Sequence, residues 1–226
     1  MKIGLLIIAT NKYVDFLQPL ISSADEFFLP NKDVTYFIFT NTDIDIKSKR
    51  NIKKIEVEHK QWPWMTLGRY KIFTENSSYL SDMNYLYYCD ADMKFENIVS
   101  DEILSDLVAT QHHGYYMTRG TPETRPESLA CVYYNEDMQY FAGGFNGGTL
   151  ESYLKMAKKL SENIDIDYSN DIIAIWHDES HLNRYLVDNK PTLILNPSYC
   201  YYDHIYDVRF EKKLVALKKN HEEIRN

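Results

Sequence analysis

The chain has little glycine or proline, few cysteines and no excess of basic charge. Eight glycines and seven prolines in 226 residues are too few for a low-complexity protein. The three cysteines (Cys89, Cys131 and Cys200) are odd in number and far apart, which argues against a disulfide framework and fits a reducing compartment. A net charge of −8 at pH 7 argues against nucleic acid as the main partner.

Long apolar runs are also absent. The apolar stretch at residues 3–9 is too short to cross a bilayer, and it lacks the basic start and cleavage site of a signal peptide. We therefore expect a cytoplasmic protein without a transmembrane segment. The length suits one sizeable core, so we expect a single domain over residues 1–226, ending in a basic tail at residues 210–226 that could move.

The apolar pattern predicts alternating strands and helices, and hence an α/β fold with a right-handed parallel crossover at the start. Strands are predicted at residues 3–9, 34–39, 52–58, 85–89, 109–116 and 192–195. Helices are predicted at residues 14–28, 67–80, 100–107, 150–160 and 178–187. The polar residues 117–136 indicate a surface loop. The aromatic and glycine-rich residues 140–148 allow either close approach of the backbone to a ligand or a tight turn.

Two carboxylates directly follow the strongly apolar strand at residues 85–89: Asp90 and Asp92, with only Ala91 between them. Ligands of an open α/β sheet bind past the carboxyl ends of its strands. Two carboxylates at this position can hold Mg²⁺ or Mn²⁺ against a diphosphate. Further Asp-x-Asp triplets lie in a polar loop (43–45) and in a capping-type segment (165–167), so context favours the first. The alternative is an ordinary acidic turn.

A second acid-rich segment carries two histidines four residues apart. His177 and His181 would share a helix face, as in zinc peptidases, but Asp178 stands where those enzymes have their catalytic glutamate. A structural alternative is that His177 and Asp178 cap a helix. A third interpretation is that Glu179 supplies the negative charge that an oxocarbenium-like transition state requires in glycosyl transfer, with Trp176 against a sugar ring.

The basic tail is the third feature. A departing diphosphate needs positive charge beyond a metal ion, and lysine or arginine on a mobile segment can supply it when a site closes. A solvated terminus is the simpler interpretation of Lys218, Lys219 and Arg225.

Taken together, these stretches resemble glycosyltransferase family 6, the retaining α-1,3-galactosyl- and N-acetylgalactosaminyltransferases that include the blood-group A and B enzymes. The similar segments follow the family's order across nearly the whole chain, at residues 9–14, 36–40, 90–93, 112–116, 143–148, 176–183, 190–192 and 219–221. The octapeptide Trp-His-Asp-Glu-Ser-His-Leu-Asn at residues 176–183 is highly specific.

The resemblance implies a GT-A fold, a Rossmann-like domain with a mixed central sheet flanked by helices. It also implies a UDP-sugar donor, a glycan or oligosaccharide acceptor, and Mn²⁺ or Mg²⁺ held by Asp90 and Asp92. The donor would be bound by Ile8, Ala9, Thr10, Tyr13, Trp62, Arg69, Asp90, Ala91, Asp92, Ala142, Gly143, Gly144, His177, Asp178, Lys219 and Arg225. The acceptor would contact His112, Trp176 and Glu179, with Glu179 facing the reacting carbon as nucleophile or charge stabiliser.

The departures from the family concern the acceptor. Residues 117–136 lack the usual acceptor-side pattern, and Tyr202 stands where the blood-group enzymes have an acidic residue, so the acceptor stays open. The small side chains of Ala142 and Gly144 leave room for an acetamido group and favour UDP-GalNAc over UDP-Gal. The chain lacks the anchor and stem of the animal enzymes, which favours a bacterial or phage-type member.

The resulting hypothesis is a retaining, metal-dependent transferase that moves GalNAc or Gal to a sugar hydroxyl in α-1,3 linkage. It requires the side chains of Asp92 and Glu179 to share one pocket. The alternatives are a nucleotide-sugar- or glycan-binding protein on the same fold with little turnover, and a zinc peptidase built on His177 and His181.

Overall fold

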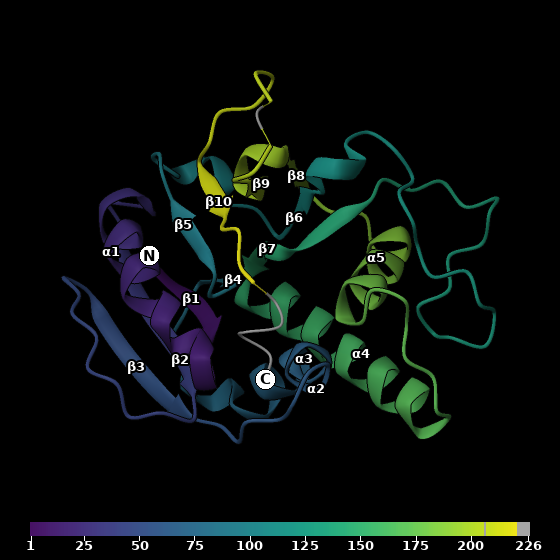
Figure 1. Ribbon diagram of the computed structural model, residues 1–226, viewed down its shortest axis with the longest axis horizontal. Coiled ribbons are helices and arrows are strands. Elements are labelled where there is room, and N and C mark those ends of the chain that lie inside the picture. The colour runs from purple at the N-terminus through teal and green to yellow at the C-terminus, as the bar shows by residue number, and fades with distance from the viewer. Residues whose placement is uncertain (206, 221–226) are drawn as a thin grey trace.

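The computed structural model describes residues 1–205 and 207–220. Within these ranges the chain forms an α/β fold in which helices cover a mixed β-sheet (Figure 1). None of the helices in these ranges combines the length and the apolar character that crossing a bilayer requires. In chain order, the elements are β1 (Lys2–Ile8), α1 (Leu17–Phe27), β2 (Asp33–Thr40), β3 (Asn51–Glu56), α2 (Trp64–Leu67), α3 (Arg69–Glu75), β4 (Tyr85–Cys89), β5 (Met93–Phe95), β6 (Leu107–Gln111), β7 (Phe141–Thr149), α4 (Leu150–Ser169), α5 (Asp178–Asp188), β8 (Leu193–Leu195), β9 (Tyr201–Tyr202) and β10 (Leu214–Ala216).

Seven strands of the described chain form the central sheet, in the order β3-β2-β1-β4-β7-β6-β8. Strand β1 lies between β2 and β4 and is parallel to both, so the predicted parallel start of the chain is confirmed. Strand β7 runs antiparallel to its neighbours β4 and β6, which makes the sheet mixed. The predicted fold class, a mixed central sheet flanked by helices, is therefore confirmed.

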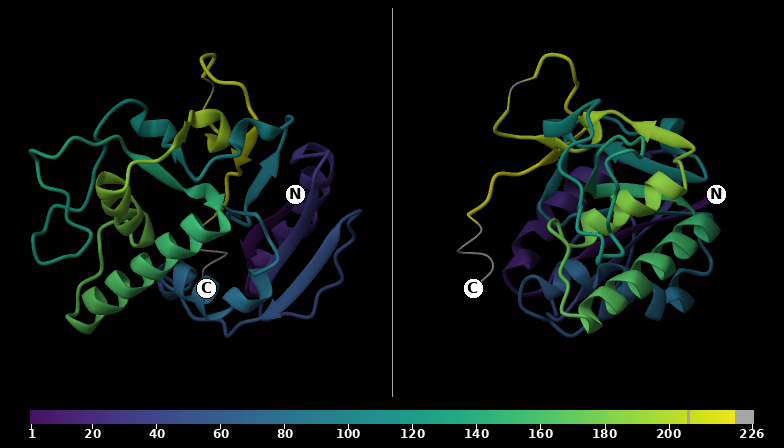
Figure 2. Two further views of the ribbon diagram at one scale, coloured as in Figure 1. Left: turned by 180° about the vertical axis from the view of Figure 1, so that it is seen from behind. Right: turned by 90° about the vertical axis from the view of Figure 1, so that its right-hand side faces the viewer.

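Both faces of the sheet are buried, because successive side chains of a strand point to opposite faces. In β1, Leu5 packs on the face that α1 covers with Leu20, whereas Leu6 packs on the opposite face. Helices α4 and α5 cover that second face with Leu160 and Leu182. Figure 2 shows α1 and α4 on opposite sides of the sheet. Burial on both faces explains why the central strands are continuous apolar runs instead of alternating patterns.

One predicted helix is absent. Residues 100–107 contain only a 3-10 turn, Asp101–Ile103, before β6 begins. The strand predicted at residues 109–116 is correspondingly shifted toward the N-terminus, and a second 3-10 turn, His113–Tyr115, follows it. Strand β6 pairs with β7 on one side and β8 on the other, so its extent is set by tertiary pairing and not by the local apolar pattern.

Two further helices differ from their predicted extent. The helix predicted at residues 67–80 is divided among α2, α3 and the 3-10 turn Ser77–Leu80. The helix predicted at residues 150–160 continues as α4 to Ser169. The third Asp-x-Asp triplet, at residues 165–167, therefore lies within a helix and not in a capping segment.

The glycine-rich segment at residues 140–148 lies almost entirely in the central strand β7 (Phe141–Thr149), so the prediction of a tight turn is wrong, and close approach of this backbone to a ligand stays a prediction. A β-carbon on Gly147 would lie 2.2 Å from the ring of Tyr87 in β4. Only a residue without a side chain lets the two strands pair at this point.

A second sheet returns the end of the described chain to the carboxylate pair. Strand β10 pairs antiparallel with β5, the strand that directly follows Asp92, and β9 completes the sheet in the described residues. The amide of Leu217 donates to the carbonyl of Asp92 at 2.9 Å. Figure 1 shows β10 running beside β5 toward the centre of the molecule. The residues that follow β10 are thereby placed at the end of β4.

Candidate active site

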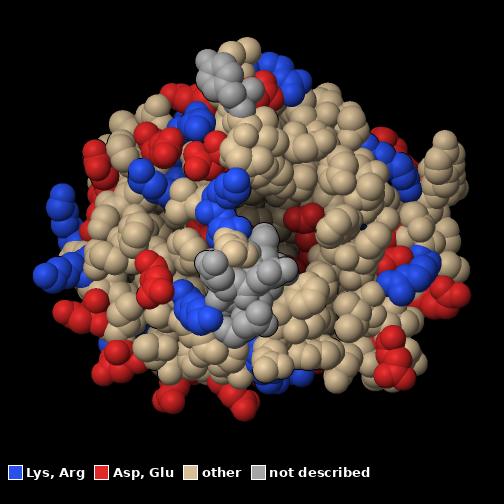
Figure 3. All heavy atoms as spheres, in the orientation of Figure 1, with Lys and Arg blue, Asp and Glu red and all other residues tan. Residues whose placement is uncertain are grey.

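A cavity of about 400 Å³ lies at the carboxyl ends of β1 and β4, the edge of an open α/β sheet at which ligands bind. Its walls come from the residues after β1, the segment between β3 and α3, the end of β4, strand β7 and the start of α5. In Figure 3 this face of the molecule is hollowed near its centre, and acidic atoms lie inside the hollow. The cavity thus collects side chains from segments far apart in the sequence.

Most site residues predicted from the sequence line this cavity: Ile8, Thr10, Tyr13, Trp62, Arg69, Asp90, Ala91, Asp92, Gly143, Gly144, Trp176, Asp178, Glu179 and Lys219. Ala9 and Ala142 are buried beside these residues and do not border the cavity. His112 and His177 are not part of its lining, and Arg225 lies outside the described residues. Asp90, Asp92 and Glu179 share one cavity, as the hypothesis requires.

Sequence patterns did not mark the remaining lining residues, which are Asn11, His59, Lys60, Gln61, Met65, Thr66 and Tyr88. Most of them belong to the segment between β3 and α3, which has no apolar period. The imidazole Nδ1 of His59 lies 2.8 Å from Oγ1 of Thr10, a contact that joins this segment to the end of β1. Tyr88 could have been found, because a strand residue two positions before Asp90 points to the same face.

Arg69 joins three walls of the cavity. Its guanidinium donates to the carbonyl of Gly143 at 2.9 Å and to Oδ1 of Asp90 at 3.2 Å. It also lies 3.1 Å from Oδ2 of Asp178 and 4.1 Å from the ring centre of Tyr88. The side chain is buried, so its charge depends on these two carboxylates for compensation. Arg69 therefore holds the end of β4, strand β7 and the start of α5 in fixed relation.

The two aspartates after β4 have different surroundings. Asp90 accepts hydrogen bonds on Oδ1 from the hydroxyl of Tyr88 at 2.5 Å and from Arg69, and its Oδ2 faces Gly144. Asp92 is buried and forms an ion pair with Lys219. Burial and the charge of Asp90 raise the pKa of Asp92, while the ammonium of Lys219 opposes that rise. The site thus places two carboxylates side by side and pairs each with a different cation, Asp90 with Arg69 and Asp92 with Lys219.

The donor atoms of this site fit a hard divalent cation. The described residues contain no group of three or more His, Cys, Asp or Glu side chains that could hold a metal ion by themselves. A zinc site takes three or four protein ligands, whereas Mg²⁺ and Mn²⁺ accept one or two carboxylates and complete their shells with phosphate and water oxygens. Asp90 and Asp92 beside a cavity suit the second arrangement.

The two histidines of the zinc-peptidase alternative lie apart. His181 is buried within α5, with Nε2 3.5 Å from Oδ2 of Asp167. His177 precedes α5 with a φ of 55°, and its ring centre is 5.0 Å from that of Trp62. They do not form the pair on one helix face that a zinc peptidase requires, so we abandon that alternative.

Glu179 lies in the first turn of α5 and faces the cavity. Its Oε1 accepts a hydrogen bond from the hydroxyl of Tyr140 at 2.9 Å, and its Oε2 accepts one from the amide of Gly143 at 2.8 Å. Burial raises the pKa of Glu179 to about 7, although both hydrogen bonds oppose the rise. Its carboxylate is fixed in position and changes charge near neutral pH.

An aromatic wall extends from Glu179 toward the surface. The ring of His112 stacks on Tyr115 at 4.8 Å between centres and meets Tyr140 edge-on at 5.6 Å. The Nε2 of His112 lies 2.5 Å from the hydroxyl of Tyr202. Burial lowers the pKa of His112 to about 4, so its ring is neutral at physiological pH. His112 is thus linked to Glu179 through Tyr140, which contacts both. Aromatic side chains that also carry a hydroxyl or ring nitrogen are suited to packing against a sugar.

The fold is of the GT-A type, which is a fold of glycosyltransferases. The model of glycosyltransferase family 6 matches residues 1–226. The chain is 33% identical over 238 aligned positions to histo-blood group ABO system transferase 2 of Rattus norvegicus, covering 99% of this chain and 71% of the relative. It is 31% identical to globoside alpha-1,3-N-acetylgalactosaminyltransferase 1 of Homo sapiens, covering 90% of this chain and 62% of the relative.

A bacterial relative is equally similar. The O-antigen biosynthesis glycosyltransferase WbnI of Escherichia coli is 30% identical over 200 positions, covering 86% of each chain. The protein therefore belongs to glycosyltransferase family 6, and it is an enzyme that transfers a hexosyl group.

Proposed function

We propose that this protein is a retaining glycosyltransferase that moves GalNAc, or Gal, from a UDP donor to a sugar hydroxyl in α-1,3 linkage, and that residues 1–226 form one catalytic domain. The observation that carries the proposal is the shared cavity: it has Asp90, Asp92 and Lys219 at one part of its wall and Glu179 at another. The names of two relatives, one a globoside N-acetylgalactosaminyltransferase and one a glycosyltransferase of O-antigen biosynthesis, support a glycan acceptor.

The donor's nucleotide would lie against Ile8, Thr10 and Tyr13, after β1. When bound, Mn²⁺ or Mg²⁺ would be held by Asp90 and Asp92 and would neutralise the diphosphate of the departing UDP. Lys219 lies beside Asp92 and adds positive charge at the same place. These residues together favour departure of UDP, which is the step that generates positive charge on the sugar.

The sugar end of the cavity is set by Glu179, Arg69 and Gly144. Glu179 offers a carboxylate, fixed by Tyr140 and Gly143, that can stabilise an oxocarbenium-like sugar. A β-carbon on Gly144 would lie 3.1 Å from Oδ2 of Asp90 and 3.3 Å from Sγ of Cys200, so the glycine lets β7 pass close to the metal-site carboxylate. The proposed preference for UDP-GalNAc is supported by the relatives, one of which is named as an N-acetylgalactosaminyltransferase.

A panel of UDP-sugars tests the proposal. We would follow UDP release with Mn²⁺ present, first without an acceptor and then with α- and β-galactosides. UDP-GalNAc is expected to give the fastest release, and UDP-Gal the next. A chain that binds these donors by calorimetry but releases no UDP from any of them, even with acceptors, would instead be the binding protein of the alternative hypothesis.

The pH dependence of transfer provides a separate prediction. If the ionised form of Glu179 is the active one, kcat/KM falls as the pH drops through about 7, where this group takes up its proton. The Tyr140 hydroxyl stabilises the ionised form, so Tyr140→Phe should raise the pKa of Glu179 and move the acid limb upward by roughly one pH unit. The measurement is kcat/KM from pH 5 to 9 at constant ionic strength.

Tyr153→Phe is the matched control for this variant. Tyr153 is also buried, but its hydroxyl has no hydrogen-bond partner among the described residues. The control should keep the wild-type pH profile. An acid limb that stays in place in Tyr140→Phe would show that Glu179 is not the group that titrates.

A further inference from the structure

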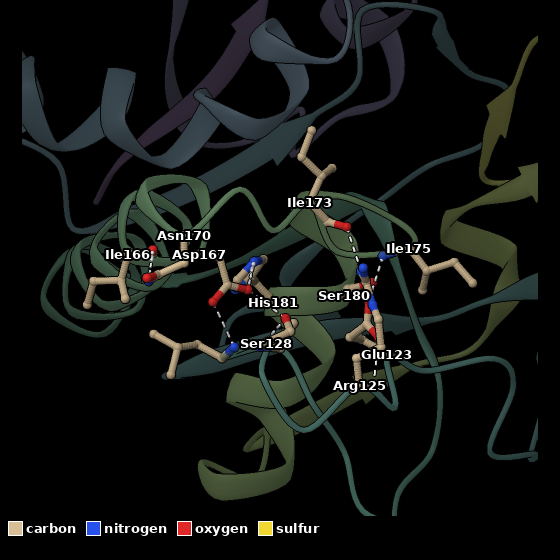
Figure 4. Close-up of polar contacts among 12 residues, drawn as sticks. Glu123, Arg125, Ser128, Ile166, Asp167, Asn170, Ile173, Ile175, Ser180 and His181 are labelled. Atoms are coloured by element: carbon tan, nitrogen blue, oxygen red, sulfur yellow. Dashed lines mark hydrogen bonds and ion pairs between the residues drawn. The ribbon is translucent and has the colours of Figure 1, made fainter.

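The loop at residues 117–136 forms hydrogen bonds with residues 173–176, the segment that leads into α5 (Figure 4). The carboxylate of Glu123 accepts a hydrogen bond from the amide of Ile175 at 2.9 Å. The guanidinium of Arg125 donates to the carbonyl of Ile173 at 2.6 Å. One carboxylate and one guanidinium of the loop thus bind an amide and a carbonyl of the same short segment.

Glu123 is built into this contact. It is only 3% exposed. Its Oε1 accepts hydrogen bonds from the backbone amides of Thr124 and Arg125. The guanidinium of Arg125 donates to both of its carboxylate oxygens. Although burial opposes it, the hydrogen bonds from Arg125 and from the backbone lower the pKa of Glu123 to about 2. The carboxylate therefore stays charged over the whole working pH range and holds its donors throughout.

Most of the side chains in this segment are exposed, and only that of Ala174 is buried. Ile173, Ile175 and Trp176 are 38%, 53% and 45% exposed. The indole Nε1 of Trp176 donates to Oγ1 of Thr121 at 2.9 Å, a third contact from the same loop. The loop therefore holds the indole, while α5 holds the backbone of the same residue, because the amide of Trp176 donates to Oγ of Ser180 at 3.0 Å.

The segment is also joined to the cavity. Trp176 lines the cavity, and the carbonyl of Trp176 accepts a hydrogen bond from the amide of Glu179 at 3.1 Å. Glu123 and Arg125 do not line the cavity. Glu179 has separate supports in Tyr140 and Gly143, so a loosened segment should move the indole before it moves the carboxylate of Glu179.

We propose that Glu123, together with Arg125, is a positioning residue for Trp176: it fixes the indole through residues 173–175 and so sets acceptor affinity without touching either substrate. The inference rests on the proposed function and on the expectation from the family resemblance that Trp176 contacts the acceptor. It assigns a role to the loop at residues 117–136, which carried no recognisable pattern in the sequence.

Glu123→Gln tests whether Glu123 positions Trp176, because it replaces one carboxylate oxygen by an NH2 group and keeps the shape of the side chain. A glutamine can keep its oxygen on the amides of Thr124 and Arg125, but its NH2 group then faces the Ile175 amide and Arg125, and donors meet donors. We expect the acceptor KM to rise on the order of tenfold, while UDP-sugar hydrolysis without acceptor stays within about twofold of wild type. Arg125→Lys should also raise the acceptor KM.

Glu136→Gln is the matched control. Glu136 lies in the same loop, accepts the amide of Tyr133 and pairs with Arg184 of α5, both at 2.7 Å. Within the described residues, the side chain of Glu136 does not contact the segment at residues 173–176. This variant should keep the wild-type acceptor KM, and Glu123→Asp, which retains the charge, should recover part of the loss seen in Glu123→Gln.

Hydrogen exchange supplies a measurement that does not depend on activity. The amides of residues 173–177 should exchange faster in Glu123→Gln than in wild type or Glu136→Gln. Unchanged exchange and unchanged acceptor KM would overturn the proposal, and so would an equal fall of hydrolysis and transfer, which indicates general loss of structure. A wild-type protein that releases no UDP would refute the proposed function instead, and exchange would still decide whether Glu123 fixes the segment.

Discussion

Glu179→Gln is expected to lower sugar transfer by about a hundredfold or more, because it removes the negative charge that faces the developing positive charge on the sugar. Glutamine fits the position: its oxygen can accept the amide of Gly143, and its NH2 group can donate to the hydroxyl of Tyr140. The fold and the affinity for UDP should therefore remain close to wild type. The measurements are initial transfer rates at saturating donor and UDP binding by calorimetry.

Glu162→Gln is a suitable control, since Glu162 is an exposed residue of α4. It should retain the wild-type rate. A near-wild-type rate in Glu179→Gln would remove this residue from the mechanism, and the charge that stabilises the sugar would have to come from elsewhere in the cavity.

Asp92→Asn should abolish the stimulation of turnover by Mn²⁺. A carboxylate that holds a hard cation contributes several kcal/mol, so we expect a loss of about a hundredfold or more in metal-stimulated turnover. Asparagine has nearly the same shape, and the backbone contact between Asp92 and Leu217 does not involve the side chain, so the fold should persist. The experiment compares UDP release with Mn²⁺ and with EDTA for both proteins, and follows thermal unfolding.

The first Asp-x-Asp triplet provides the control. Asp45 lies exposed in the loop before β3, and Asp45→Asn should leave the metal response unchanged. Full activity of the wild-type protein in EDTA would count decisively against a metal role for Asp90 and Asp92, and Lys219 would then be the main cation at the diphosphate.

Much of the candidate site could be predicted from short stretches of sequence. The change from the apolar β4 to Asp90 and Asp92 occurs within a few residues, and it marks the carboxyl edge of the sheet whatever the rest of the chain does. The octapeptide at residues 176–183 likewise brings Trp176, Asp178 and Glu179 together on one turn. Both are local patterns, and both lie at the cavity.

Predictions from local pattern were wrong where pairing with distant segments decided the outcome. Residues 140–148 carry glycines that suit a turn, yet they form β7 because β4 and β6 pair with them on both sides. The triplet at residues 165–167 was expected in a capping segment, yet α4 extends through it. Asp167 is buried there, where Ser128 and the amide of Leu129 donate to it.

The sequence by itself determined the α/β class, the strand edge at which ligands bind, and the acidic residues available for chemistry, because each depends on neighbours within one strand or one helical turn. Only the tertiary structure decided which groups meet. Tyr140 reaches Glu179 across 39 residues, and Lys219 reaches Asp92 across 127. These contacts depend on α5 packing against β7 and on β10 pairing with β5, and contacts over such separations leave no mark in local apolar periodicity.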